Sequence, residues 1–326
     1  MLPHFYYPEC PWSMKAAALL PIAFAVFAAA CAGSPHPTTT ASRPAGVQVA
    51  VTIDDLPWVG WTRSGESSQV ATRRLLSTLK ETSVPAVGFV NCERVIPEEG
   101  ILEMWLAAGM ELGNHTGSHS DLNKVEPDAW AADVERCHRF LQAATGRPPI
   151  FFRYPFLREG STIERLALGR KTLKQLGYIN ASVTIDNSET MLASAYSRAA
   201  ADGDLARAGE IVSAYLRHMT AALAHFDRAA QEAFGGRRIP HVLLLHANLL
   251  NADHLGRLLQ AYRDRGVEFI TLAAALSDPA YRQDISYVGP KGPSLVYRIS
   301  SSVRARWSAW DDAESASIRE RFFQSQ

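Results

Sequence analysis

Two groups of polar residues, well separated in the chain, have the composition of a divalent-metal site. Asp54 and Asp55 follow an apolar run, and His115 and His119 belong to the segment His-Thr-Gly-Ser-His. One carboxylate and two imidazoles would supply three protein ligands and leave one coordination position open for water, as in catalytic zinc-type sites. The other carboxylate would then be free to act as a base. The residues therefore predict a catalytic metal centre.

Structural roles are the alternative for these residues. The two histidines could be polar loop residues or part of a helix N-cap region around Thr116 and Ser118, and an Asp-Asp pair often forms a turn or cap. If His115 and His119 lie on one helical turn, however, their imidazoles share a side. Two carboxylates buried together without a metal would repel each other, so one would stay protonated. A metal at one carboxylate and a cation near the other would remove this conflict.

Two further residues complete the candidate chemistry. Arg153 follows an apolar run and could supply the cation, although a surface or phosphate-facing arginine is the alternative. His246 closes the run Leu243–Leu245, where a histidine is often a satisfied core residue. We prefer a general acid, because histidine titrates near the working pH of most enzymes.

The segments around these residues alternate between strand and helix patterns. Near-continuous apolar strands separated by amphipathic helices predict a parallel sheet covered by helices, and about seven such units favour a barrel over two domains. In a parallel barrel the carboxyl ends of the strands face the site, and each polar group follows a strand. The expected strands are 47–53, 84–90, 110–113, 150–153, 179–185, 241–246 and 267–271, and the expected helices are 70–80, 101–108, 128–144, 162–176 and 254–265.

Two segments depart from this alternation. Residues 191–236 are Ala-rich and helical in pattern, with a break near 201–204, which predicts a helical hairpin inserted before the penultimate strands. Residues 279–326 form a C-terminal extension that begins irregularly and ends in a charged, partly helical tail. The main domain is therefore expected to span residues 47–278.

The composition sets limits on the partner. Of 326 residues, 47% are hydrophobic, and the 33 basic residues balance the 33 acidic ones. A chain without net charge has no global field that would attract nucleic acid, so we expect a neutral or mixed polymer rather than DNA.

The N-terminus resembles an export signal. Residues 1–31 contain a basic start, a short apolar run and small residues that end at Cys31, like a bacterial lipobox. A marginal membrane anchor is the alternative. Lipidation of Cys31 would tether the protein to a membrane through the Pro/Ser/Thr-rich linker 32–46, in the periplasm or elsewhere in the cell envelope. Cys92 and Cys137 remain in the expected folded body, and sequence alone leaves their pairing open.

Taken in order, the motifs resemble the NodB homology domain, the polysaccharide deacetylases of carbohydrate esterase family 4. The likeness runs from Val47 to about Ala275. The first two motifs, in that order, are the specific ones, and the third and fifth are looser. The matching segments are Thr52-Ile53-Asp54-Asp55, His115-Thr116-Gly117-Ser118-His119, Arg153-Tyr154-Pro155-Phe156 and Leu244-Leu245-His246.

The resemblance implies a deformed (β/α)7 barrel and a role for each matching residue. Asp55, His115 and His119 would bind the metal, and Asp54 would deprotonate the attacking water. Arg153 would orient Asp54, the backbone N–H of Tyr154 would help to hold the oxyanion, and His246 would protonate the leaving amine.

The fourth motif differs from the family pattern Asp-x-x-Asp-Trp, since this chain has Asp186-Asn187-Ser188-Glu189-Thr190. The acidic residue that tunes His246 would be Glu189 or Asp186, and Thr190 stands where a Trp would wall the site. The helical insert could rebuild that wall.

The sequence therefore predicts a metal-dependent hydrolase that removes N-acetyl groups from an amino-sugar polysaccharide such as peptidoglycan, a chitin-like polymer or an exopolysaccharide. Zinc is the expected ion, and cobalt, nickel or iron suit the same ligands. The alternatives are an O-acetyl esterase acting on polysaccharide and a catalytically impaired glycan-binding domain.

Overall fold

The computed structural model describes residues 46–323. The expected signal peptide (1–31), Cys31 and all but the last residue of the expected linker (32–46) lie outside the described residues, so these predictions stay untested. Among the helices of residues 46–323, none is long and apolar enough to cross a membrane.

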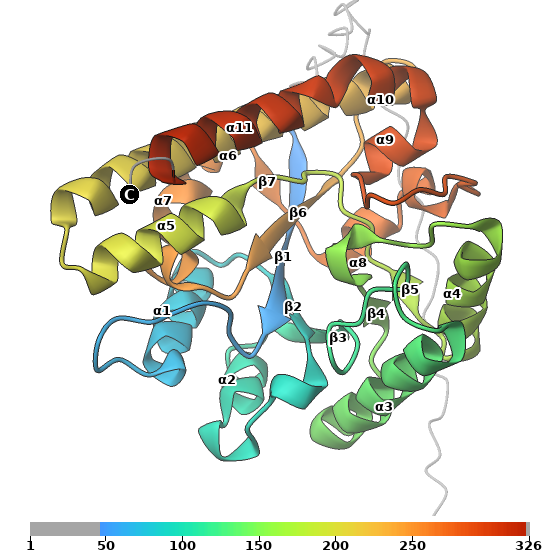
Figure 1. Cartoon of the computed structure of the whole chain (residues 1–326), viewed down its shortest axis with the longest axis horizontal. Coiled ribbons are helices and arrows are strands. Elements are labelled where there is room, and N and C mark those ends of the chain that lie inside the picture. The colour runs from blue at the N-terminus through green and yellow to red at the C-terminus, as the bar shows by residue number, and fades with distance from the viewer. Residues whose placement is uncertain (1–45, 324–326) are drawn as a thin grey trace, which may run out of the picture. The chain divides into compact units, whose positions relative to one another are not determined.

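In the described part of the chain, a curled sheet of seven parallel strands forms the centre of the fold (Figure 1). The strand order is β5-β4-β3-β2-β1-β6, and β7 pairs with the first residues of β1. The central position of β1 explains why its residues are almost all buried. The strands are β1 Gln48–Leu56, β2 Ala86–Val90, β3 Glu111–Asn114, β4 Phe151–Phe152, β5 Ile179–Asn180, β6 His241–His246 and β7 Glu268–Phe269.

The sheet closes toward a barrel through the segment that follows β5. Ile185 forms a parallel bridge with Leu243 of β6, so the chain reaches the opposite edge of the sheet. The deformed barrel expected from the sequence is therefore confirmed. The expected strand 179–185 was too long, because the Ser182 amide donates to the Asn180 carbonyl in a turn that releases the chain from β4.

The helices that follow the strands cover the sheet with their apolar faces. Several begin at a side-chain cap: Ser67 accepts from the Val70 amide and Asn248 from the Asn251 amide. The Asn248 cap explains why α7 begins several residues before the expected start at His254. These helices are α1 Ser68–Glu81, α2 Ile101–Ala107, α3 Pro127–Thr145, α4 Ile163–Gln175, α7 Leu249–Arg263 and α8 Leu272–Leu276, with 3-10 turns at Cys92–Arg94, Pro97–Glu99, Pro155–Leu157 and Pro279–Arg282.

The expected insert is a helical hairpin, and the C-terminal extension is largely helical. Helices α5 (Glu189–Ala201) and α6 (Leu205–Ala233) lie between β5 and β6, and Asp204 caps α6 after the expected break. Figure 1 shows α11 running along α5 and α6. The extension was expected to be partly helical, and its helices bury apolar side chains such as Val303 and Ile318. Its helices are α9 Leu295–Ile299, α10 Ser301–Trp307 and α11 Ala309–Phe323.

Candidate active site

An irregularity at the end of β1 brings the two aspartates to one side. Neighbouring residues of a regular strand point to opposite faces. Here the register between β1 and β2 shifts between Ile53 and Leu56, and Asp55 has a φ of 64°. Both Asp54 and Asp55 consequently line the same cavity. A positive φ is costly for a residue other than glycine, and such conformations cluster at functional sites.

The segment after β3 places the two histidines together, but in an irregular loop. The helical turn expected for this segment is wrong, since Thr116 and His119 have φ values of 64° and 60°. The reason is Asp133 of α3, whose carboxylate accepts hydrogen bonds from the Ser118 amide (3.1 Å) and the Ser120 hydroxyl (2.7 Å). The Ser118 amide and the Ser120 hydroxyl thus bond to a side chain of helix α3 rather than to the backbone of their own segment. The rings of His115 and His119 nevertheless lie edge to face, with centroids 4.9 Å apart.

Asp55, His115 and His119 form a cluster that fits a divalent cation. Each offers one ligand atom, and these atoms all lie within 4.8 Å of one another. The Nε2 atoms of His119 and His115 are 3.3 and 3.7 Å from Asp55 Oδ1. His115 Nδ1 is 2.8 Å from the Arg153 carbonyl and must donate to it, which leaves the Nε2 lone pair free for a metal. Burial lowers the pKa of His115 to about 3, so its imidazole is neutral, as coordination requires.

The same carboxylate has a buried oxygen that lacks a partner. Among the residues that the structure describes, none is hydrogen-bonded to Asp55 Oδ1. The Arg94 guanidinium is 3.8 Å away, which is too far for a hydrogen bond. A buried charged oxygen without a partner is costly, and a bound cation would remove that cost.

Asp54 is paired with a buried cation. Arg153 Nη1 lies 3.2 and 3.3 Å from the two carboxylate oxygens, and Arg153 is only 1% exposed. The guanidinium also donates to the Ala181 carbonyl (2.6 Å) and the Thr52 hydroxyl (3.0 Å). Burial raises the pKa of Asp54, and the charge of Arg153 acts in the opposite direction. The alternative of a surface arginine is therefore wrong.

His246 is held by Glu189 from the first turn of α5. His246 Nδ1 is 2.9 Å from Glu189 Oε2, and Glu189 is fully buried. The other carboxylate oxygen of Glu189 accepts hydrogen bonds from the side-chain amides of Asn248 and Asn251. Burial alone would lower the pKa of His246, but the hydrogen bond and charge of Glu189, together with the charges of Asp54 and Asp55, outweigh burial and raise this pKa to about 9.

The other acidic candidate, Asp186, makes a different contact. Its carboxylate accepts from the Asn187 amide at 2.8 Å, and it lines the same cavity as His246. Burial raises the pKa of Asp186 to about 6. Of the two acids left open by the sequence, Glu189 is the one hydrogen-bonded to His246.

Tyr154 lies with its side chain outside the cavity. Its ring is stacked on Trp130, with centroids 5.5 Å apart, and meets Phe152 edge to face. The side chain thus belongs to a core cluster between α3 and the sheet. The expected role of the backbone N–H stays a prediction.

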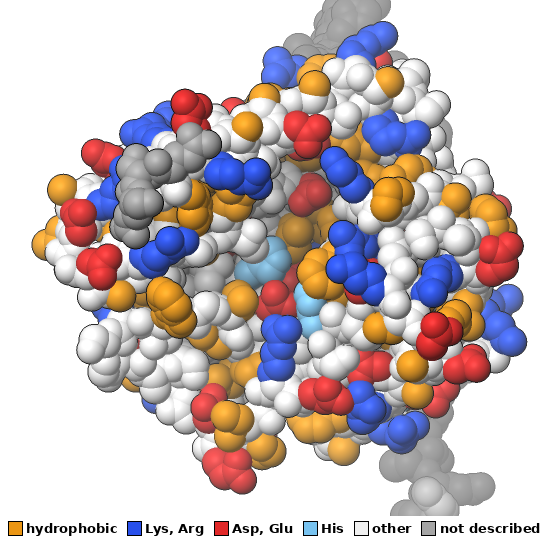
Figure 2. Space-filling view, viewed as in Figure 1, with side chains coloured by type: hydrophobic (Ala, Val, Ile, Leu, Met, Phe, Trp, Pro, Cys, Tyr) orange, Lys and Arg blue, Asp and Glu red, His pale blue; other side chains and the backbone are white. Residues whose placement is uncertain are grey.

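The cavity has a volume of about 320 Å³. Figure 2 shows histidine and acidic side chains at the bottom of a hollow on this face. One wall comes from the C-terminal extension, because a Cβ on Gly292 would lie 2.1 Å from the Phe156 carbonyl oxygen. Only a residue without a side chain permits this approach. The lining residues are Asp54, Asp55, His115, His119, Phe156, Leu157, Asp186, Asn187, Thr190, Leu244, His246 and Gly292.

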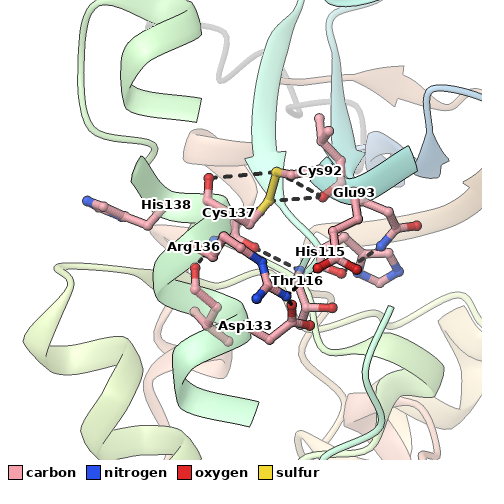
Figure 3. Close-up of a disulfide and its surroundings, with 12 residues drawn as sticks. Cys92, Glu93, His115, Thr116, Asp133, Arg136, Cys137 and His138 are labelled. Carbon is pink, nitrogen blue, oxygen red and sulfur yellow. Dashed lines mark hydrogen bonds and ion pairs between the residues drawn. A yellow bond between two sulfur atoms is a disulfide. The ribbon is translucent and has the colours of Figure 1, made fainter. Parts of the chain in front are cut away.

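A disulfide supports the histidine loop from behind (Figure 3). Cys92 and Cys137 are bonded, with Cα atoms 5.4 Å apart, which settles the pairing that the sequence left open. The adjacent Glu93 amide donates to the Gly117 carbonyl at 3.0 Å, and the Asn91 side chain donates to the His115 carbonyl at 2.7 Å. The disulfide thus ties these contacts to α3.

Besides Asn91, sequence reasoning missed other polar residues that support the site. Asp133, Asn248 and Asn251 are all buried, and each holds a residue or loop of the candidate centre. Asn248 and Asn251 lie two and five residues after His246, so their closeness in the chain was a usable signal. Asp133 sits inside an amphipathic helix pattern and gave none.

Together, the fold and the site define a parallel α/β barrel with a three-ligand candidate metal centre at the carboxyl ends of its strands. Residues 42–180 match the family model described as "Polysaccharide deacetylase". Over these residues, which make up less than half of the chain, the sequence is similar to the polysaccharide deacetylase family.

Known proteins with similar sequences include two deacetylases. A chitin deacetylase from Pestalotiopsis sp is 27% identical over 183 residues, which cover 52% of this chain and 56% of that protein. A peptidoglycan-N-acetylglucosamine deacetylase from Bacillus cereus is 29% identical over 109 residues, 33% of this chain and 36% of that protein. The chain thus matches about half of the first relative and about a third of the second.

Among solved structures, a family 4 carbohydrate esterase from Streptomyces lividans in complex with acetate has 18% identity and a TM-score of 0.46, covering 71% of this chain and 95% of that one.

Proposed function

We propose that this protein is a metal-dependent hydrolase that removes N-acetyl groups from an amino-sugar polysaccharide, such as peptidoglycan, a chitin-like polymer or an exopolysaccharide. One observation carries the proposal. The cluster of Asp55, His115 and His119 lies beside the buried base candidate Asp54, and His246 lines the same cavity.

The residues divide the chemistry of amide hydrolysis between them. A divalent ion held by Asp55, His115 and His119 would supply Lewis-acid activation of a water and of the acyl carbonyl. Asp54 accepts the proton of the attacking water, while Arg153 orients it and limits the rise of its pKa. The backbone N–H of Tyr154 is proposed to donate to the developing oxyanion.

His246 is proposed as the acid that releases the product. An amide nitrogen must be protonated before it can leave, and the raised pKa of His246, about 9, keeps the proton available at neutral pH. In ester hydrolysis the leaving group is an alcohol oxygen, and its departure requires protonation less than the departure of an amine nitrogen does. The raised pKa therefore favours N-deacetylation over the O-acetyl esterase alternative, and the buried Glu189 partner argues against a degenerate, glycan-binding domain.

Zinc is the proposed ion. Two imidazoles and one carboxylate with an open position are usual for catalytic zinc, although cobalt, nickel and iron accept the same ligands. The buried, unpartnered Asp55 Oδ1 supports a cation of this kind.

A second groove beside the cavity supports an extended substrate. Thr190 lines both spaces, and the groove, about 400 Å³ in volume, also includes Trp61, Ser194 and Arg198. Trp61 is 65% exposed. An exposed indole offers a flat apolar face, on which the apolar face of a neighbouring sugar ring can pack. The proposed substrate is therefore an oligomer or polymer rather than a free monosaccharide.

The decisive test is acetate release from N-acetylglucosamine oligomers with native protein, chelated protein and chelated protein reloaded with zinc. We expect activity to vanish with the chelator and to return with the ion. Equal rates in all three samples would refute metal dependence. Faster release from O-acetylated xylan than from chitin oligomers would favour the esterase.

An exported, periplasmic or lipid-anchored location remains part of the proposal. The Cys92–Cys137 disulfide supports it, because such bonds persist mainly in oxidising compartments. Mass spectrometry of the mature protein would test it by reporting whether the chain begins at a lipidated Cys31.

A further inference from the structure

We infer that His218 of α6 and the C-terminal helix α11 position the catalytic acid, because together they fix the first turn of α5, which holds Glu189 against His246. The inference rests on the proposed function for the role of His246, but the contacts themselves are independent of it. His218 and the α11 residues involved are positioning residues, since they lie outside the catalytic cavity.

His218 connects the start of α5 to the tail through both ring nitrogens. Its Nε2 lies 2.9 Å from the Ser188 amide, which can only donate, so Nε2 accepts. The proton is therefore on Nδ1, which lies 3.0 Å from Glu314 Oε2 of α11 and donates to it. Burial lowers the pKa of His218, which favours this neutral form. Trp310 stacks on the ring, with the two planes 5° apart.

A second contact joins the same residue of α5 to α11. The hydroxyls of Ser188 and Ser315 are 2.7 Å apart and hydrogen-bonded. Ser188 is the N-cap residue of α5, yet its side chain makes no capping hydrogen bond to the helix. Helix starts without such a cap are less stable. Locally, Asn187 Oδ1 accepts from the Glu189 amide at 2.9 Å. The tail and α6 add a second set of hydrogen bonds at Ser188, one residue before Glu189.

The position of Glu189 matters because the hydrogen bond and charge of Glu189 raise the pKa of His246 and so keep it protonated. His246 also faces Asp54 and Asp55 of β1, Asp186 before α5 and His119 of the loop after β3. None of these groups is hydrogen-bonded to α11, although the carboxylate of Asp311 in α11 interacts electrostatically with Asp186. The variants chosen below therefore leave Asp311 in place, so that the change they make in the tail acts on Glu189. Small displacements of catalytic groups are expensive, since about 1 Å can cost about 100-fold in rate.

The test compares variants that lack the hydrogen bonds joining Ser188, His218 and Glu314 with variants that keep them. His218→Phe keeps an aromatic ring but removes both hydrogen bonds, and His218→Gln retains a side-chain acceptor for the Ser188 amide. Glu314→Ala removes the α11 partner. The matched control is Glu232→Ala, which also cuts a contact between α6 and the tail, the bond from Trp307 Nε1 at 2.9 Å, without touching Ser188.

Two readouts are taken on zinc-loaded protein: kcat and KM for a chitin oligomer, and the pKa of His246 from an NMR titration. We expect His218→Phe and Glu314→Ala to lower kcat about tenfold or more at unchanged KM and zinc content, and to lower the pKa of His246, as loss of a supporting partner does. His218→Gln should recover part of both effects, and Glu232→Ala should change neither.

An unchanged His246 pKa in His218→Phe and Glu314→Ala would overturn the inference. If His218→Phe fails to fold, as judged by circular dichroism, Ser315→Ala and Glu314→Ala decide the question. If the wild-type protein releases no acetate, the proposed function fails, whereas the NMR titration still tests the connection between α11 and His246.

Discussion

Asp54 of β1 and His246 of β6 are register partners on neighbouring parallel strands. The proposed base and the proposed acid therefore occupy opposite positions at the carboxyl end of the sheet, and the backbone ladder fixes their separation. A shift of one residue in this register would turn one side chain to the opposite face of the sheet. The acid–base pair is thus specified by strand pairing, whereas the metal cluster depends on a bulge and a loop.

Adjacent substitutions should separate the base from the metal. Asp54→Asn removes the proton acceptor and should lower kcat by about 10²- to 10⁴-fold while zinc remains bound. Asp55→Asn removes a ligand, so zinc should be lost as well as activity. Acetate release and zinc content of the two purified variants provide the measurement. Loss of zinc in both variants, or in neither, would contradict the assigned roles.

The pH dependence should follow the pKa of His246. The acid must be protonated, so kcat should fall as the pH rises through about 9. Glu189→Gln removes the charge that raises this pKa, and the alkaline limb should move to lower pH. The same reasoning applies to stability: the pKa is higher in the folded state than its usual value of about 6.5. The contribution of protonated His246 to the free energy of unfolding is then full below about pH 6.5 and lost as the pH rises through about 9. An alkaline limb that does not move in Glu189→Gln would exclude His246 as the acid.

Reduction of the disulfide should destabilise the protein and loosen the histidine loop. Loss of the Cys92–Cys137 bond is expected to lower the free energy of unfolding by about 2–5 kcal/mol. Zinc affinity should also fall, because Glu93 and Asn91 support the loop from the same side. Urea unfolding and zinc titration with and without reductant measure both effects. A Cys92→Ala, Cys137→Ala protein is the control, since the reductant should leave it unchanged.

Asp133 should control metal affinity from a distance. Asp133→Ala removes the acceptor for Ser118 and Ser120, so the loop that carries His115 and His119 loses its anchor. By analogy with residues that support metal ligands, zinc affinity should fall about 10- to 100-fold. Asp128→Ala, an exposed acid in the first turn of the same helix, is the matched control. Equal zinc affinity of the two variants would show that the conformation of the histidine loop does not depend on Asp133.

Trp61 should matter for long substrates only. Trp61→Ala removes an exposed ring from the groove that Thr190 joins to the catalytic cavity. We expect KM to rise about tenfold for a chitin oligomer, consistent with about 1 kcal/mol or more for an aromatic contact, and to stay constant for a disaccharide. A matching rise for both substrates would place Trp61 in the folding of the loop rather than in substrate binding.

The strand pattern and the strand-end residues could be predicted because each is local. A β-branched apolar run ending in Asp54-Asp55 identifies a buried strand and a functional end at once. Thr116 and His119 show the limit of such reasoning, since the conformation of their loop depends on Asp133, a residue on a later helix.

The extension was the least predictable part. Gly289-Pro290-Lys291-Gly292-Pro293 reads as an ordinary irregular linker, and nothing local indicates that Gly292 packs on the turn at Phe156. The choice between Asp186 and Glu189 was equally hidden, because it depends on where α5 begins. The residue before that start, Ser188, contacts α6 and α11, which are far away in the chain.

The place of Gly292 in the wall has a consequence for the newly made chain. All the proposed metal ligands, the base and the acid are translated well before residue 292. The hollow that surrounds them, however, lacks one side until the segment around Gly292 has been synthesised and has folded back. A nascent or truncated product would thus carry every reactive group and still present an open, half-built pocket to its surroundings.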